Sequence, residues 1–186
     1  MPDSEALLST LESLRSRGAL GERDLTAAIA HAEQFVAALP ETARRLLDLG
    51  SGGGLPGLVI AVRCPVLTVV LTDRRQRRAD LLRLACLQLG IEQRVAVLTA
   101  DVAALAEDRT MRQRFDAVTA RSFGSPLWTL RCAAPFLVDG GTVIVSEPPN
   151  AEAGRWPEAE VFELGFEPSP NAFPGVRCFR RRDGFT

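Results

Sequence analysis

The chain has 186 residues, of which 46% are hydrophobic and 24% charged, and its formal net charge is −1. This size and composition are typical of one globular domain with a sizeable core, and no apolar run approaches the roughly 20 residues needed to span a bilayer. The sequence contains no lysine and no tyrosine, so its 22 basic side chains are all arginine. That absence excludes Walker-type triphosphatases, pyridoxal enzymes and dehydrogenases that use a Tyr/Lys pair.

Cysteine and histidine usage indicates that the protein has no metal site. The four cysteines are far apart and form no CxxC pair, so we expect reduced and mostly buried thiols. His31 is the only histidine, and a Ser-His-Asp triad or a multi-histidine metal site would depend on it alone. We expect His31 to be a solvated or capping imidazole. The start of the chain is acidic and lacks a secretory apolar core, which predicts a cytoplasmic protein.

The first 40 residues predict two helices. Leucines at helical spacing run from Ser4 to Arg17, and a second apolar repeat runs from Glu22 to Leu39 and stops at Pro40. Because both helices precede the first strand, we expect them to cover the edge of the sheet or a cofactor.

The stretch from Leu46 to Gly57 combines a short apolar strand, a glycine-rich turn and the start of a helix. Its glycines are Gly50, Gly52, Gly53, Gly54 and Gly57. Glycine has no Cβ and tolerates positive φ, so the backbone of such a turn can approach a ligand closely. Strand, turn and helix in this order are typical of the nucleotide-binding corner of a doubly wound α/β sheet.

Two carboxylates distinguish between the ligands that such a corner binds. Asp48 precedes the glycines, where it would repel a pyrophosphate but attract an amino group or a sulfonium. Asp73 ends the next apolar run, about 20 residues further on, and suits a carboxylate that accepts both ribose hydroxyls. S-adenosyl-L-methionine (SAM) has a ribose and a cationic methionine end but no phosphate, so we predict a SAM site. Two alternatives stay open: an NAD site, since Gly52 to Gly57 match GxGxxG, and two aspartates that only cap helices.

Strands and helices alternate through the rest of the chain. Further strands are predicted at 66–72, 94–99, 115–119, 142–146, 161–164 and 176–181. One helix opens at Asp73, and another runs from Pro126 through Leu137 to the turn Asp139-Gly-Gly141. We predict an α/β fold with one mainly parallel seven-stranded sheet and helices on both faces. It would form a single domain, 1–186, with a helical segment over 1–40 and a Rossmann-like core over 44–186.

Three stretches resemble class I SAM-dependent methyltransferases, and more narrowly the RsmG/GidB family. They are Asp48-Leu-Gly-Ser-Gly-Gly-Gly-Leu-Pro-Gly57, Asp73 with its arginine-rich helix start, and Phe115-Asp-Ala-Val-Thr-Ala-Arg-Ser122. The Gly-Leu-Pro-Gly extension is the most specific part of this resemblance, which covers roughly residues 25 to 147. It implies SAM as cofactor, S-adenosyl-L-homocysteine as product, and methyl transfer to N7 of a guanine in 16S ribosomal RNA of the 30S subunit.

The resemblance also implies roles for individual residues. The methionine end of SAM would be held by Asp48, Gly50, Ser51, Gly52 and Gly54. Asp73 would bind the ribose with Arg74 beside it, and Ala100 and Asp101 would lie at the adenine. Asp101 follows a predicted strand and equally suits the N-cap of the next helix. Arg121 would lie at the methyl group and the guanine as the catalytic residue, with Ser122 and Glu147 as further substrate-binding residues.

Some positions depart from the family pattern. The N-terminal part is short, Thr99 stands where an arginine is common, and Glu147 stands where the family has a Lys-Gly. Arginines at 74, 75, 77 and 78 and at 177 and 180–182 suit RNA phosphates, whereas the net charge of −1 does not favour an RNA partner. The arginines from 74 to 78 equally fit a solvated helix face whose side chains pair with carboxylates. The arginines from 177 to 182 equally fit an edge strand with a charged outer face. A small-molecule methyltransferase and an inactive SAM-binding protein therefore remain alternatives, and the oligomeric state stays open.

Overall fold

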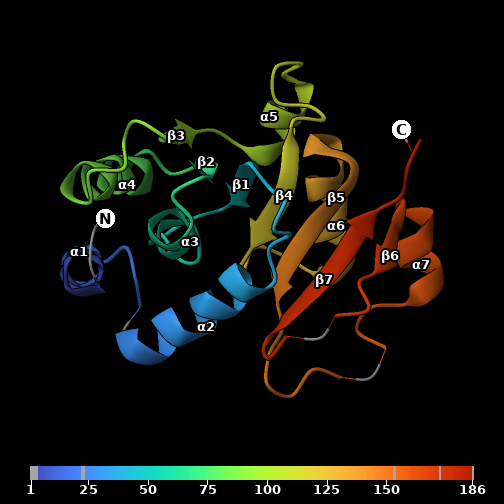
Figure 1. Ribbon diagram of the computed structural model, residues 1–186, viewed down its shortest axis with the longest axis horizontal. Helices are drawn as coiled ribbons and strands as arrows, with labels where there is room; N and C mark the ends of the chain where they lie inside the picture. The colour runs from blue at the N-terminus through green and yellow to red at the C-terminus, as the bar shows by residue number, and fades with distance from the viewer. Residues whose placement is uncertain (1–3, 22–23, 153, 172, 186) are drawn as a thin grey trace.

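The fold is built on one seven-stranded sheet with strand order β3-β2-β1-β4-β5-β7-β6 (Figure 1). The computed structural model describes residues 4–21, 24–152, 154–171 and 173–185. The strands are β1 (Arg45–Leu49), β2 (Thr68–Asp73), β3 (Val95–Thr99), β4 (Phe115–Ala120), β5 (Leu137–Ser146), β6 (Phe166–Pro168) and β7 (Val176–Arg181). β1 to β5 are mutually parallel, and β7 pairs antiparallel with β5 and β6. The predicted mainly parallel α/β sheet is confirmed.

Helices cover both faces of the sheet, as predicted. One face packs against α1 (Ser4–Ser16), α2 (Leu25–Ala37), α3 (Gly57–Arg63) and α4 (Gln76–Gln88). The other packs against α5 (Val102–Glu107), α6 (Pro126–Ala133), the 3-10 turn η1 (Ala134–Phe136) and α7 (Glu158–Glu163). Successive residues of a strand point to opposite faces, so buried Leu46 joins the first layer and buried Leu47 the second. This explains why the strands are apolar on both sides.

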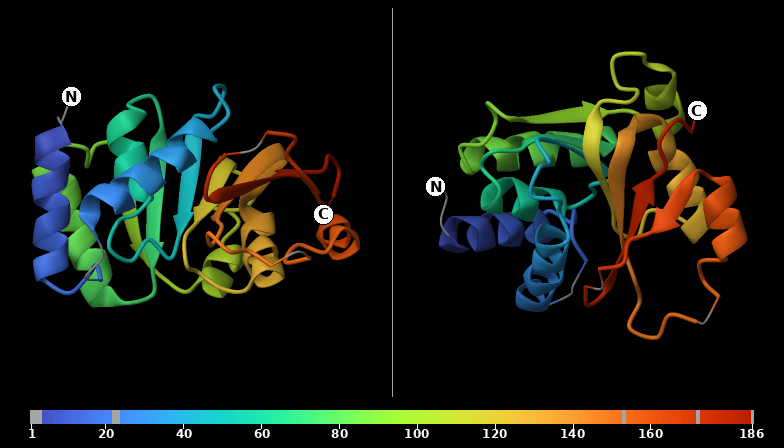
Figure 2. Two further views of the ribbon diagram at one scale, coloured as in Figure 1. Left: turned by 90° about the horizontal axis from the view of Figure 1, so that it is seen from below. Right: turned by 45° about the vertical axis from the view of Figure 1, so that its right-hand side comes forward.

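The two N-terminal helices lie against the half of the sheet that carries the glycine turn. α1 packs beside α4, and α2 packs across α3 (Figures 1 and 2). α2 begins at Leu25 because Asp24 caps it, its carboxylate accepting a hydrogen bond of 2.9 Å from the Thr26 amide. Glu22, where the sequence places the start of this helix, lies outside the described residues. No helix among the described residues has the length and apolar character that a bilayer crossing requires.

The C-terminal part differs from the sequence prediction in two elements. Residues 161–164, predicted as a strand, belong to α7 and to its C-terminal end. Pro157 precedes this helix and Glu158 and Glu160 lie in its first turn, where carboxylates favour a helix N-terminus. The edge strand is instead the short β6, which ends at Pro168.

β7 is therefore an inner strand and not the predicted edge. It lies between β5 and β6. Arg181 is consequently buried, with a relative exposure of 6%, and its guanidinium donates to the backbone oxygen of Leu164. Arg180 points outward and pairs with Glu167 and Asp183.

The helix predicted from Pro126 through Leu137 is shorter than expected. α6 ends at Ala133, and the chain passes through η1 directly into β5 at Leu137. Pro135 has no amide hydrogen to continue the helical hydrogen bonds, which accounts for the break. The division of one domain into 1–40 and 44–186 stays a prediction.

Candidate functional site

The glycine turn after β1 is fastened to the end of β2 by hydrogen bonds. The Ser51 amide donates to the Thr72 backbone oxygen at 2.7 Å, and the Gly50 amide donates to Thr72 Oγ1 at 3.3 Å. In return the Thr72 amide donates to Ser51 Oγ at 3.1 Å, and Thr72 Oγ1 donates to the Asp48 backbone oxygen at 2.9 Å. These hydrogen bonds fix the shape of the turn and engage the amides of Gly50 and Ser51.

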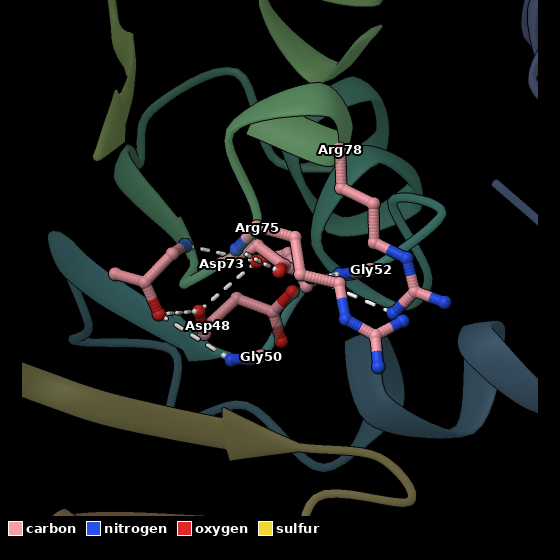
Figure 3. A network of polar contacts seen from close by, with 8 residues as sticks. Asp48, Gly50, Gly52, Asp73, Arg75 and Arg78 are labelled. Carbon is pink, nitrogen blue, oxygen red and sulfur yellow. Dashed lines mark hydrogen bonds and ion pairs between the residues drawn. The ribbon is translucent and has the colours of Figure 1, made fainter. Parts of the chain in front are cut away.

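Asp73 continues this network at the end of β2 (Figure 3). Its Oδ2 accepts a hydrogen bond of 3.1 Å from the Gly52 amide, and its Oδ1 accepts one of 2.8 Å from the Arg75 amide. Arg78 extends from α4 to the same carboxylate, with 3.8 Å between Nη1 and Oδ2. The carboxylate is 6% exposed and is held in one orientation from three sides. It links the turn after β1 to the turn after β2.

Asp48 lies beneath the glycine turn and is completely enclosed. Its Oδ1 accepts a hydrogen bond of 2.6 Å from Thr119 Oγ1 on β4. Burial raises the pKa of Asp48 to about 6, and the hydrogen bond from Thr119 is the largest of the effects that oppose this rise. Ser51, the backbone of Gly57 and the charge of Arg121 lower the pKa further, each by less. Asp48 is therefore a buried acid whose pKa lies well above that of an exposed aspartate.

Two glycines let the backbone pack closely around this acid. A Cβ on Gly57 would lie 2.7 Å from Asp48 Oδ2 and 2.4 Å from Leu71 Cδ2, so a larger residue at the start of α3 would force both buried side chains to move. Gly54 has φ +89°, and a Cβ there would lie 2.4 Å from Leu58 Cδ1. Neither Gly54 nor Gly57 lines the cavities described next, so the close packing at both positions is against side chains of the protein itself.

Two adjoining cavities open above the carboxyl ends of β1, β2 and β4. The first, of about 320 Å³, is called here the glycine cavity and the second, of about 390 Å³, the Asp73 cavity. The glycine cavity is lined by residues 19–21, 25, 28, 50–53, 55, 78, 121 and 122. The Asp73 cavity is lined by residues 50, 72–75, 78, 100–102, 122, 123 and 128. Gly50, Arg78 and Ser122 belong to both, so one ligand can extend through the two.

A third cavity, of about 810 Å³, lies on the other side of the turn after β4. It is called here the Glu147 cavity and is lined by residues 24, 27, 28, 31, 121, 122, 146–149, 155 and 175. Arg121 and Ser122 line both this cavity and the glycine cavity. A second reactant in the Glu147 cavity would therefore meet a ligand of the glycine cavity at this shared wall.

The structure brings most of the predicted site residues together. The glycine cavity receives Gly50, Ser51, Gly52 and Arg121, the Asp73 cavity receives Asp73, Arg74, Ala100 and Asp101, and Ser122 borders both. Glu147 lines the third cavity with Arg121 and Ser122. Asp48 and Gly54 lie under the turn and line none of the three. Asp101 caps α5, its Oδ1 accepting from the Ala103 amide at 2.9 Å.

Several lining residues were not predicted from the sequence. Leu20 comes from the connection between α1 and α2 and covers Gly53, where a Cβ would lie 2.4 Å from its side chain. His31 lines the Glu147 cavity, and its Nε2 forms a hydrogen bond of 2.9 Å with the Gly175 backbone oxygen, so the half-exposed imidazole contacts the loop before β7 and does not cap a helix. Trp128 is 53% exposed at the rim of the Asp73 cavity. Arg75 and Arg78, which line the Asp73 cavity, carried a signal in the sequence as members of the arginine run.

An arginine-rich rim borders the glycine cavity and the Asp73 cavity, and it consists of Arg17, Arg74, Arg75, Arg77 and Arg78. Arg17, Arg75, Arg77 and Arg78 line a further hollow of about 210 Å³ next to the glycine turn, and Arg74 lines the Asp73 cavity. Among the described residues the only ion pair of this group joins Arg78 to Asp73, while Arg77 donates to the backbone oxygen of Arg17 at 3.1 Å. Arg74, Arg75 and Arg77 are exposed, as expected of a solvated face, and none of the three forms an ion pair with a carboxylate among the described residues.

Comparison with known proteins assigns a family to this arrangement. The family model described as "GidB: rRNA small subunit methyltransferase G" matches residues 10–158. The chain belongs to this family. The ribosomal RNA small subunit methyltransferase G of Methylococcus capsulatus is 39% identical over 123 residues, which are 65% of this chain and 54% of that relative. The protein of the same name from Laribacter hongkongensis is 32% identical over 141 residues, 72% of this chain and 66% of that relative.

The GidB match extends through the glycine turn, Asp73 and Glu147. The chain spans about half the length of most of the curated relatives it matches. A solved methyltransferase from Geobacter sulfurreducens superposes with a TM-score of 0.67 at 14% identity, covering 98% of this chain and 91% of that one. PigF, solved with S-adenosyl-L-homocysteine, gives a TM-score of 0.63 at 16% identity, covering 96% and 70%. These likenesses confirm the Rossmann-like class I methyltransferase fold.

We predict that Asp48→Asn stabilises the ligand-free protein above about pH 6. The folded pKa of Asp48 is raised, so its protonated form is favoured by folding, and the stability it contributes is lost as the pH rises from about 4 through about 6. Asparagine resembles the protonated acid at every pH. The variant should gain up to about 3 kcal/mol at pH 8 and almost nothing at pH 4.

Urea unfolding of the wild type and Asp48→Asn across this pH range measures the difference. Asp80→Asn, an exposed acid on α4, is the control and should follow the wild type. If Asp48→Asn also runs parallel to the wild type at all pH values, Asp48 is not the titrating group.

Proposed function

We propose that this chain binds SAM through the glycine and Asp73 cavities. The observation that carries the proposal is the engagement of the turn's amides by Thr72 and Asp73. A dinucleotide corner uses such amides to bind a pyrophosphate, whereas here the Gly52 amide faces a carboxylate at 3.1 Å. A negative charge at this point repels phosphate and suits a ligand without one. This supports SAM over NAD.

The lining residues suit the parts of SAM. Asp73, with Arg74 beside it, would accept hydrogen bonds from the ribose hydroxyls, and Ala100 and Asp101 would lie at the adenine. Gly50, Ser51 and Gly52 would border the methionine end. The direct contact of Asp48 with the methionine amino group stays a prediction. In this structure the carboxylate is covered by the turn and bonded to Thr119, so its charge would act through the turn.

We further propose that the acceptor is N7 of a guanine in 16S ribosomal RNA, presented from the Glu147 cavity. Family membership supports this assignment, and a ribosomal acceptor implies a cytoplasmic location. SAM supplies a methyl group on a cationic sulfur: N7 forms a bond to the methyl carbon with its lone pair while the carbon–sulfur electrons return to sulfur. No proton moves, so the chain needs no general base. Arg121 and Ser122, at the wall shared by the cavities, would align the acceptor and exclude water.

The test is transfer of a tritiated methyl group from SAM to three acceptors: 30S subunits, naked 16S ribosomal RNA and a metabolite extract. Labelled RNA digested to nucleosides should yield 7-methylguanosine. Label in small molecules alone would establish the second candidate, a small-molecule methyltransferase, which the net charge of −1 favours. SAM binding with no transfer to any acceptor would indicate an inactive SAM-binding protein.

We predict that Asp73→Asn weakens SAM binding at least roughly tenfold, because an amide accepts only one of the two ribose hydroxyl hydrogen bonds and carries no charge. Isothermal titration with SAM measures the dissociation constant. Asp80→Asn is the matched control, since Asp80 is exposed and lines neither cavity. Thermal unfolding checks that the turn survives loss of the Asp73 charge. Unchanged SAM affinity in a folded Asp73→Asn variant would contradict the ribose assignment.

We predict that the arginine-rich rim binds RNA phosphates. Arg77→Gln should weaken RNA binding about two- to fivefold at low salt and lower the slope of log affinity against log salt by about 0.7 to 0.9. SAM affinity should not change, because Arg77 lines neither cofactor cavity. Arg109→Gln, between α5 and the amino end of β4, is the control with the same charge change. Equal salt slopes for Arg77→Gln and Arg109→Gln would contradict a role of this rim.

A further inference from the structure

Glu147 is held in a fixed orientation at the end of β5. Arg155 Nε donates to Oε1 at 2.9 Å, and Trp156 Nε1 donates to Oε2 at 2.9 Å. Trp156 is itself anchored by the Phe179 ring on β7, with 4.6 Å between ring centroids. Each carboxylate oxygen has two lone pairs, so each can accept one more hydrogen bond. The side chain retains 17% exposure and faces the Glu147 cavity.

This carboxylate lies one residue from the wall where the two reactants would meet. The preceding residue, Ser146, accepts a hydrogen bond of 3.3 Å at Oγ from the Ser122 amide. Ser122 lines the glycine cavity, the Asp73 cavity and the Glu147 cavity. A planar group that reaches from Glu147 to Ser122 would therefore present its far edge to the methyl donor.

We propose that Glu147 selects guanine by accepting hydrogen bonds from its N1–H and 2-amino groups. The inference rests on the proposed function and assigns the specificity of the same site. These two donors lie side by side on one edge of guanine and match the two oxygens of a carboxylate. Adenine and cytosine present an amino group next to a bare ring nitrogen, and uracil presents one N–H between two carbonyl oxygens. Each of those bases would place an acceptor against the carboxylate.

The position of N7 and the charge of the product agree with this role. N7 belongs to the five-membered ring, away from the edge that Glu147 would hold, so binding at that edge leaves N7 free to face Arg121 and Ser122. Methylation at N7 makes the base cationic, and its N1–H and 2-amino groups become stronger donors. A carboxylate on that edge therefore binds the methylated base, and the transition state that leads to it, better than the neutral guanine.

The test uses 16S ribosomal RNA assembled by ligation so that the methylated position carries either guanosine or inosine. Inosine keeps N7 and N1–H but lacks the 2-amino group. For the wild type, kcat/KM should be at least roughly tenfold higher with guanosine, because inosine lacks one hydrogen bond to a charged group. In Glu147→Gln the neutral amide presents its own NH₂ to the 2-amino group, and the ratio should fall to within about twofold.

The guanosine-to-inosine ratio separates recognition from a structural role. If Glu147 only held Arg155 and Trp156 in place, Glu147→Gln would slow both substrates equally and leave the ratio unchanged, which would overturn the proposal. A wild type without preference for guanosine would overturn it whether or not the variant folds. Glu152→Gln, in the same loop but outside the cavity, should keep the wild-type ratio, and SAM affinity should be equal in all three proteins. No methylation of the guanosine RNA by the wild type would reject the proposed function itself.

Discussion

The site depends on the burial of one carboxylate beneath a glycine turn. Asp48 is enclosed by β4, by the turn and by the start of α3, and it is bonded to Thr119. Enclosure disfavours the ionised form of the carboxyl group, and the pKa of Asp48 is raised for this reason. The turn above it keeps its shape because Ser51 and Thr72 exchange hydrogen bonds between the ends of β1 and β2. These hydrogen bonds therefore set the shape of the glycine and Asp73 cavities.

Charge is arranged by depth around this turn. Carboxylates lie inside, Asp48 under the turn and Asp73 at its edge, while the arginines lie on the rim. A net charge of −1 is thus compatible with a basic surface around the opening, because the total does not report how charges are distributed. The interior acids suit a cationic cofactor, and the rim suits a polyanion. Arg121 and Ser122 belong to the wall between the glycine cavity and the Glu147 cavity.

The sequence predicted the elements whose signals are local. The glycine turn, the alternation of strands and helices, and the placement of Asp73 at a strand end are encoded within short stretches and are confirmed. The failures have two causes. The inner position of β7 follows from a distant partner, the pairing of β6 beyond it, whereas at α7 the local helix signal of acidic residues after Pro157 outweighs the apolar run that predicted a strand. His31 could not be placed from sequence, because its hydrogen-bond partner Gly175 is 144 residues away. The enclosure of Asp48 likewise depends on Thr119, a contact that no spacing rule reports.

The close approach of Gly57 to Asp48 has a consequence for how this sequence can diverge. A side chain at 57 would meet both the carboxylate and Leu71, so the glycine cannot be replaced while position 48 keeps an acid of this length. Replacing Asp48 by a smaller neutral residue would relieve one of the two clashes. It would also remove the free-energy cost of ionising a buried carboxyl group. Because the closer contact with Leu71 would remain, lineages that abandon the acid should lose the glycine only where position 71 also carries a smaller side chain.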